Sequence, residues 1–250
     1  MFCAGLVSVS FRSLSVDDII ELAKSAGLSC IEWGSDVHAP RDDDKILLHI
    51  AKKQKEAGLF CSSYGTYFTL GKDTTDQLCE YIRAARILGT DTLRIWCSKK
   101  SWREHTAEER ELLLSEAKRA AWIAESHGVR LCLECHSNTY TDEVEGALDI
   151  MREVGSQAFL MYWQPNQNKS EEQNIEYAER ISPYTVNIHV FNWKGKGKYP
   201  LREASDIWSK YLRSFDGTQR LLLEFMPDGL PASLGREAMA LRDIIGEVKI

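Results

Sequence analysis

Residues 129–139, VRLCLECHSNT, combine an apolar strand with polar side chains at its C-terminal end. Glu134 and His136 are two residues apart, so on a strand their side chains project to the same face. An ionised carboxylate at the end of an apolar strand is costly unless it is paired, hydrated or bound to a metal ion. The strand by itself leaves a structural salt bridge and a functional site equally open.

The alternation of a short apolar run and a longer amphipathic segment recurs along the whole chain. Strands are predicted at residues 7–11, 29–34, 59–64, 92–97, 129–136, 158–164, 185–192 and 220–226. Helices are predicted at residues 16–26, 42–57, 75–88, 106–127, 141–154, 170–181, 201–213 and 232–246. Strands that alternate with helices pair in parallel. Eight such units in 250 residues predict an α/β fold, a single (β/α)8 TIM barrel domain over residues 1–250.

The main alternative fold is a doubly wound open sheet. A glycine-rich phosphate-binding turn after the first strand would favour that fold. The turn at residues 12–18 is RSLSVDD and contains no glycine. The barrel is therefore the favoured architecture.

Charge and hydropathy narrow the classes of function. The net charge is -6 and no basic face is evident, which disfavours nucleic-acid binding. No apolar run reaches the roughly 18 residues that a membrane-spanning helix requires. The N-terminal residues MFCAGLVSVSF lack a charged segment followed by a long apolar one, as a secretory signal would have. We expect a cytoplasmic protein that has no targeting segment and does not bind membranes.

Seven cysteines are scattered along the chain, most of them in apolar runs, and are expected to be free and buried. The spacing of Cys132 and Cys135 superficially matches a redox or zinc motif. Residues three apart on one strand face opposite sides, however, so we expect no functional cysteine pair here.

Three later strands also end on polar residues that can act as ligands. In a parallel barrel, catalytic groups gather at the C-terminal ends of the strands. About one strand–helix unit separates each of Glu134, Gln164, His189 and Glu224 from the next. Two carboxylates, an imidazole and an amide oxygen suit one divalent metal ion, Mn²⁺ or Mg²⁺, with Zn²⁺ or Co²⁺ as alternatives. A metal-free polar cluster or four separate salt bridges is the other interpretation.

With these strand ends, the sequence resembles the xylose-isomerase-like barrel superfamily of sugar isomerases, sugar epimerases, inosose dehydratases and relatives of the apurinic endonucleases. The resemblance covers nearly the whole chain. Its most specific segments are residues 31–38 (IEWGSDVH), 63–71 (SYGTYFTLG) and 133–139 (LECHSNT), together with the strands of His189 and Glu224.

The resemblance implies one metal ion held by a Glu, an Asp, a His and a Glu from the last four strands. These positions match Glu134, Gln164, His189 and Glu224. Gln164 replaces the Asp and removes one negative charge from the site. Two further family positions, a His and a basic residue, fall on Gln167 and Gly195.

The resemblance also implies a set of residues that bind the substrate. Glu32 and His38 match substrate-side positions of the family, and His136 lies beside Glu134. Aromatic side chains near strand ends could stack on a sugar ring, although each could equally pack the barrel. Arg94 could orient the substrate or form a salt bridge to Glu134. The expected substrate-binding set is Glu32, His38, Tyr64, Arg94, Trp96, His136 and Trp193.

The expected activity is that of a metal-dependent isomerase or epimerase of a small-molecule sugar or polyol. Glu134 and Glu224 would act as an acid/base pair that exchanges a proton on carbon through an enediolate-like intermediate. A metal-dependent dehydratase of a keto-polyol and a non-catalytic carbohydrate-binding barrel are the alternatives. Nucleic-acid repair is disfavoured by the acidic charge. Barrels of this kind often dimerise, so a homodimer is one expectation, although the sequence has no evident interface signature.

Overall fold

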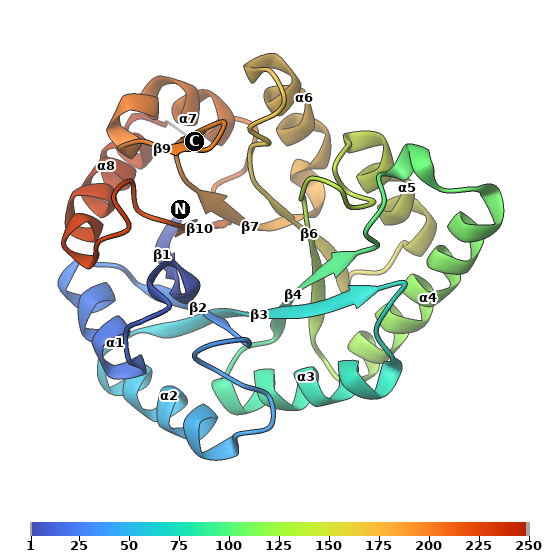
Figure 1. Ribbon diagram of the computed structural model, residues 1–250, viewed down its shortest axis with the longest axis horizontal. Helices are drawn as coiled ribbons and strands as arrows, with labels where there is room; N and C mark the ends of the chain where they lie inside the picture. The colour runs from blue at the N-terminus through green and yellow to red at the C-terminus, as the bar shows by residue number, and fades with distance from the viewer. Residues whose placement is uncertain (1, 249–250) are drawn as a thin grey trace.

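Eight parallel strands close into a barrel in the computed structural model, which describes residues 2–248 (Figure 1). Their order around the barrel is β1-β10-β7-β6-β5-β4-β3-β2. The strands are β1 (Cys3–Val7), β2 (Cys30–Gly34), β3 (Phe60–Leu70), β4 (Thr92–Cys97), β5 (Arg130–Glu134), β6 (Phe159–Trp163), β7 (Thr185–Val190) and β10 (Arg220–Leu223). The predicted TIM barrel is confirmed.

Helices follow the strands and surround the barrel (Figure 1). They are α1 (Val16–Ser25), α2 (Asp44–Glu56), α3 (Thr75–Leu88), α4 (Ala107–Ser126), α5 (Val144–Val154), α6 (Glu171–Ile181), α7 (Ser205–Leu212) and α8 (Leu234–Glu247). Local signals define several ends. Thr106 and Glu109 form a capping box at the start of α4. Gly89 ends α3 with a φ of 82°, a left-handed conformation that glycine adopts without strain.

The first strand was predicted too late in the sequence. Residues 7–11 were expected to be a strand, but only Val7 is, and the remainder forms the short 3-10 helix η1 (Ser8–Phe11). The alternating pattern of residues 7–11 continues beyond the point where the backbone turns. The Ser8 hydroxyl accepts a hydrogen bond from the Gly34 N–H at 2.9 Å, so this segment folds over the end of β2.

Two other segments are more ordered than predicted. β3 was expected to end at residue 64 but continues to Leu70, where it pairs with the end of β4. The lysine- and glycine-rich loop after β7 forms an antiparallel hairpin of β8 (Trp193–Lys194) and β9 (Gly197–Lys198). Both segments rise beside the C-terminal end of the barrel.

Strand alternation separates two buried layers. On β5, Leu131 and Leu133 pack in the large apolar layer between strands and helices, whereas Cys132 lies in the smaller interior cluster. Glu134 follows Cys132 by two residues and so also faces inward. All seven cysteines are free thiols, five of them buried, with Cys3 half-buried and Cys79 exposed. Within residues 2–248, no helix has the length and apolar character needed to cross a membrane.

Candidate active site

A cavity of about 360 Å³ opens at the C-terminal end of the barrel. Seven of the predicted site residues line it: Arg94, Trp96, Glu134, His136, Gln164, Trp193 and Glu224. These side chains come from five different strands or the segments that follow them. The spacing of one strand–helix unit therefore brings them together as expected.

Glu134 is held by three donors. It forms a buried salt bridge with Arg94, accepts a hydrogen bond from Trp96 Nε1 at 2.6 Å and accepts another from Gln164 Nε2 at 3.2 Å. Burial by itself would raise the pKa of Glu134, but Arg94 and His189 hold it well below its usual range. Glu134 is therefore ionised and fixed in orientation. The sequence could not decide whether Glu134 forms a salt bridge; in the structure it pairs with Arg94, and both residues line the cavity.

His189 lies directly beneath the cavity and is fully buried. Its Nδ1 is 3.2 Å from Gln164 Oε1, 3.6 Å from Glu134 Oε1 and 3.7 Å from Glu224 Oε2. Burial would lower the pKa of His189, but the carboxylates of Glu224 and Glu32 raise it to about 10. Of the four residues that the sequence assigned to a metal site, the other three thus converge on the Nδ1 atom of His189.

Glu32 lies below the cavity and does not line it. Its carboxylate is fully buried, 3.0 Å from Arg94 Nε and 3.4 Å from His189 Nε2, and accepts a hydrogen bond from Ser63 Oγ at 3.1 Å. Burial would raise the pKa of Glu32, but His189 and Arg94 lower it to about 2. In the structure, Glu32 contacts these two side chains beneath the cavity, and the substrate-side role that the resemblance implied stays a prediction.

Glu224 is in a different electrostatic setting from Glu134. Burial raises its pKa, and the neighbouring Glu134 adds to that effect, while His189 opposes it. Its side chain remains 13% exposed, at the cavity. Two carboxylates that face one cavity therefore differ in proton affinity, with Glu224 the one that holds a proton more readily.

Tyr64 and His38 do not reach the cavity. The Tyr64 ring faces the helices, 5.9 Å from the ring of Tyr81, and its hydroxyl donates to the Ala39 carbonyl at 2.6 Å. His38 is only 4% exposed, with Nδ1 3.2 Å from Ser8 Oγ. Tyr64 was chosen as a strand-end residue, but β3 continues for six more residues, and Tyr67 is the tyrosine that lines the cavity.

The residues that line the cavity outside the predicted set include Arg12, Tyr67 and Phe225. Arg12 directly follows η1, on the segment after β1, and residues that follow the strands of a barrel are candidates for its site. Phe225 has a φ of 53°, an uncommon conformation for a bulky side chain, which turns the chain sharply after Glu224. His136, which also lines the cavity, stacks on Trp96 with ring centroids 4.9 Å apart.

The donor set of the barrel mouth suits a divalent metal ion only if Gln164 takes part. Among residues 2–248, no group of three or more His, Cys, Asp or Glu side chains has an arrangement that would hold a metal ion. Gln164 adds an amide oxygen to the oxygens of Glu134 and Glu224 around His189 Nδ1. Glu32 accepts at Nε2, which directs Nδ1 toward these oxygens, as carboxylates behind metal-binding histidines do.

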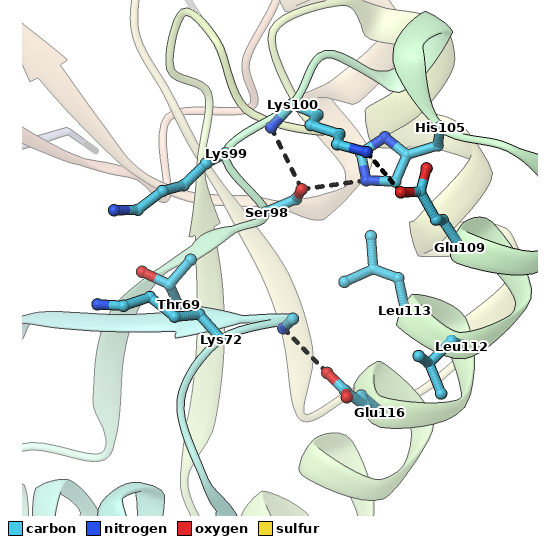
Figure 2. A pocket seen from close by; sticks show the side chains of 11 residues that line it. Thr69, Lys72, Ser98, Lys99, Lys100, His105, Glu109, Leu112, Leu113 and Glu116 are labelled. Carbon is cyan, nitrogen blue, oxygen red and sulfur yellow. Dashed lines mark hydrogen bonds and ion pairs between the residues drawn. The ribbon is translucent and has the colours of Figure 1, made fainter.

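A second cavity, of about 350 Å³, lies outside the barrel between the ends of β3 and β4 and the helix α4 (Figure 2). Its acidic side chains are already paired. Glu109 contacts Lys100 Nζ at 2.5 Å, and Glu116 accepts from the Gly71 N–H at 2.9 Å. Figure 2 shows Lys72 and Lys99 extending to the side opposite Glu109. The barrel mouth, where carboxylates of unlike proton affinity share a cavity, is the better candidate for catalysis.

Known proteins with similar sequences and structures include dehydratases and epimerases. A curated 3-dehydroshikimate dehydratase from Bacillus anthracis is 22% identical over 222 residues, covering 82% of this chain and 77% of that protein. The crystal structure of a probable 3-DHS dehydratase from the same organism matches with a TM-score of 0.81 and 17% identity, covering 97% of this chain and 99% of that one. A D-psicose 3-epimerase with D-tagatose, from Clostridium cellulolyticum H10, matches with a TM-score of 0.73 and 12% identity over the full length of both chains.

A further solved structure contains a metal ion. It is a xylose isomerase-like TIM barrel protein from Mycobacterium smegmatis in complex with magnesium, with a TM-score of 0.73 and 13% identity over 100% of this chain and 98% of that one. At these identities the structural likeness establishes the fold alone. The family is established by a sequence model that matches residues 20–199. The chain belongs to the xylose isomerase-like TIM barrel family.

Proposed function

We propose that this protein is a metal-dependent isomerase or epimerase of a sugar or polyol. The reaction is the transfer of a proton at a carbon beside a carbonyl group, through an enediolate-like intermediate. The substrate binds in the cavity at the barrel mouth, between Glu134 and Glu224.

The observation that carries this proposal is the placement of two carboxylates, Glu134 and Glu224, at one cavity in different electrostatic settings. Arg94 and His189 keep Glu134 ionised, whereas burial raises the pKa of Glu224. Paired carboxylates whose environments push their pKa values apart are the usual arrangement for an acid and a base that act together. Glu134 stays ionised, as a group that accepts a proton from carbon must be, and Glu224 would act as its partner acid.

A divalent metal ion, Mn²⁺ or Mg²⁺, fits the charge of the site. To bind the metal, His189 and Glu224 must both be deprotonated. The carboxylates of Glu32, Glu134 and Glu224 then oppose Arg94 alone, and two negative charges remain to be balanced. Glu134, Gln164, His189 and Glu224 would hold the metal. When bound, it would supply Lewis-acid stabilisation of negative charge on the substrate oxygen.

The remaining cavity residues have binding roles in this proposal. The Trp96 indole N–H and the Arg94 guanidinium keep the Glu134 carboxylate oriented. His136, stacked on Trp96, and Trp193, tilted against Phe225 with ring centroids 5.5 Å apart, offer flat surfaces to the cavity. Such surfaces bind the apolar face of a sugar ring.

A dehydratase of a keto-polyol is the second candidate. Three donors immobilise Glu134, so Glu224 is the carboxylate with more freedom to move a proton. A single group that removes a proton and returns it to a departing hydroxyl is sufficient for elimination. The relative named as a 3-dehydroshikimate dehydratase supports the same alternative.

The test is proton–deuterium exchange into a panel of ketoses and keto-inositols, with added Mn²⁺ and product analysis by NMR. Exchange with retention of the carbon skeleton and its oxygens supports the isomerase or epimerase. Loss of water supports the dehydratase. Metal analysis of the purified protein accompanies both measurements.

The variant Glu224→Gln is expected to reduce exchange at least 100-fold, which is the lower range for the loss of a general acid or base. Glu116→Gln makes the same substitution in the second cavity and is expected to leave exchange unchanged. Bound metal and bound sugar without exchange on any substrate would refute the catalytic proposal and leave a carbohydrate-binding barrel.

A further inference from the structure

We propose that Arg12 and Tyr67 form a subsite for an anionic group of the substrate, a carboxylate or a phosphate, at the rim of the barrel-mouth cavity. This inference rests on the proposed function, because it names the class of sugar or polyol that the same cavity accepts. Both residues line the cavity, on the side where the segments following β1 and β2 meet β3.

The two arginines of the cavity differ in what they can still bind. Arg94 is buried, and Glu32 and Glu134 occupy its guanidinium. The Arg12 side chain is 51% exposed and pairs with Asp36 through one nitrogen, Nη2. A guanidinium has five N–H donors in a planar fork that matches carboxylate and phosphate oxygens. Arg12 therefore has donors that the pair with Asp36 does not use.

Tyr67 adds a neutral donor beside Arg12. Tyr67 lines the same cavity as Arg12. Burial and the Asp36 carboxylate raise the pKa of Tyr67, which keeps its hydroxyl protonated. The Tyr67 ring also lies 5.9 Å from the ring of Trp96, whose indole N–H binds Glu134. Arg12, Tyr67, Trp96 and Glu134 thus form one continuous wall from the rim to the reacting carboxylate.

The charge distribution selects where an anion can lie in this cavity. In the metal-free protein, the carboxylate oxygens of Glu134 and Glu224 disfavour an anionic group at the inner end, while the unused donors of Arg12 can bind it at the rim. An anionic substrate would therefore enter with its charged group toward Arg12 and its uncharged hydroxyl and carbonyl groups toward Glu134 and Glu224. Such orientation is what a substrate needs before proton transfer at one carbon.

Binding of matched ligand pairs tests the subsite without requiring turnover. Isothermal titration calorimetry would compare quinate with neutral myo-inositol, and D-fructose 6-phosphate with D-fructose. The wild-type protein is expected to bind at least one anionic member about tenfold or more tightly than its neutral counterpart. The two pairs distinguish a carboxylate from a phosphate. Absence of preference in both pairs, or absence of binding by both anions, overturns the proposal.

Variants on the two sides of the ion pair give opposite predictions. Arg12→Gln is expected to abolish the anion preference while retaining affinity for neutral ligands, and Arg12→Lys to keep part of it. Asp36→Asn releases Arg12 and is expected to tighten anion binding. Arg41→Gln, which removes a half-buried arginine that is paired with Glu80 and does not line the cavity, is the control and leaves binding unchanged.

A merely structural role for Arg12 would give a different pattern. Arg12→Gln would then weaken neutral and anionic ligands equally, and Asp36→Asn would weaken both as well. Because binding is measured without reaction, anion preference in a protein that shows no solvent exchange would refute the proposed catalysis and leave the subsite standing. Exchange on neutral sugars without anion preference would refute the subsite and leave the proposed catalysis standing.

Discussion

Replacing Glu32 by glutamine tests the buried charge network beneath the cavity. The substitution keeps the shape of the side chain and removes the negative charge that lies 3.4 Å from His189 Nε2 and 3.0 Å from Arg94 Nε. Arg94 retains Glu134 as a partner, whereas His189 retains the two carboxylates on its Nδ1 side. The perturbation is therefore a partial loss of charge compensation in a fully buried group.

The size of the effect follows from the distances. Unit charges 3.4 Å apart interact by about 5 kcal/mol at an effective dielectric constant of about 20. Removing one partner of a buried ion pair costs about 3–5 kcal/mol in measured cases. Because the amide oxygen of glutamine still accepts hydrogen bonds and both cations keep other partners, we expect the lower end, about 3 kcal/mol of lost unfolding free energy at pH 6.

Urea unfolding of the metal-free protein, followed by tryptophan fluorescence at pH 6, measures this loss. NMR titration of the histidines in the same samples is expected to report a lower pKa for His189 in the variant, because the charge that stabilises its protonated form has gone. Glu237→Gln is the matched control. Glu237 is also buried, but its carboxylate accepts from the Leu201 N–H and is remote from His189. A loss below about 1 kcal/mol together with an unchanged His189 titration would refute the reasoning.

Three further results are expected. In the metal-free protein, protonated His189 stabilises the fold fully below about pH 6.5, and this stabilisation is lost as the pH rises toward its folded pKa of about 10. Urea unfolding across that pH range would measure the loss, and an unfolding free energy that does not change with pH would contradict it. Gln164→Asp adds a negative charge beside His189 and is expected to tighten Mn²⁺ binding tenfold or more by calorimetry; weaker binding would argue against Gln164 as a ligand. Tyr64→Phe removes the hydrogen bond to the Ala39 carbonyl and should cost about 1 kcal/mol of stability without altering ligand affinity, so an altered affinity would return Tyr64 to the site.

The barrel and its ring of polar strand ends were predictable from the chain alone. The alternation of strands and helices depends on local periodicity, on capping residues such as Thr106 and on turn glycines such as Gly89. All of these signals can be recognised within a short segment of sequence. A closed parallel barrel then brings the C-terminal ends of its strands to one face. Glu134, Gln164 and Glu224 consequently line one cavity, with His189 directly beneath it.

The exact ends of strands depend on details that sequence periodicity does not show. Tyr64 lies within β3 and not at its end, because β3 continues to Leu70 and its register with neighbouring strands shifts at irregular points. The first strand was displaced because the apolar alternation runs on into η1. Strand ends are set by where backbone hydrogen bonding stops, and that depends on the partner strand.

The roles of the charged residues were decided only by the tertiary structure. Glu32 and His189 are separated by 157 positions in sequence, yet their side chains meet, and Arg94 joins Glu32 to Glu134. The site contains three glutamates of identical side-chain chemistry, Glu32, Glu134 and Glu224. Arg94 and His189 keep Glu32 and Glu134 ionised, whereas burial raises the pKa of Glu224. These differences arise because charge interactions depend on distance and solvation in space and not on separation along the chain.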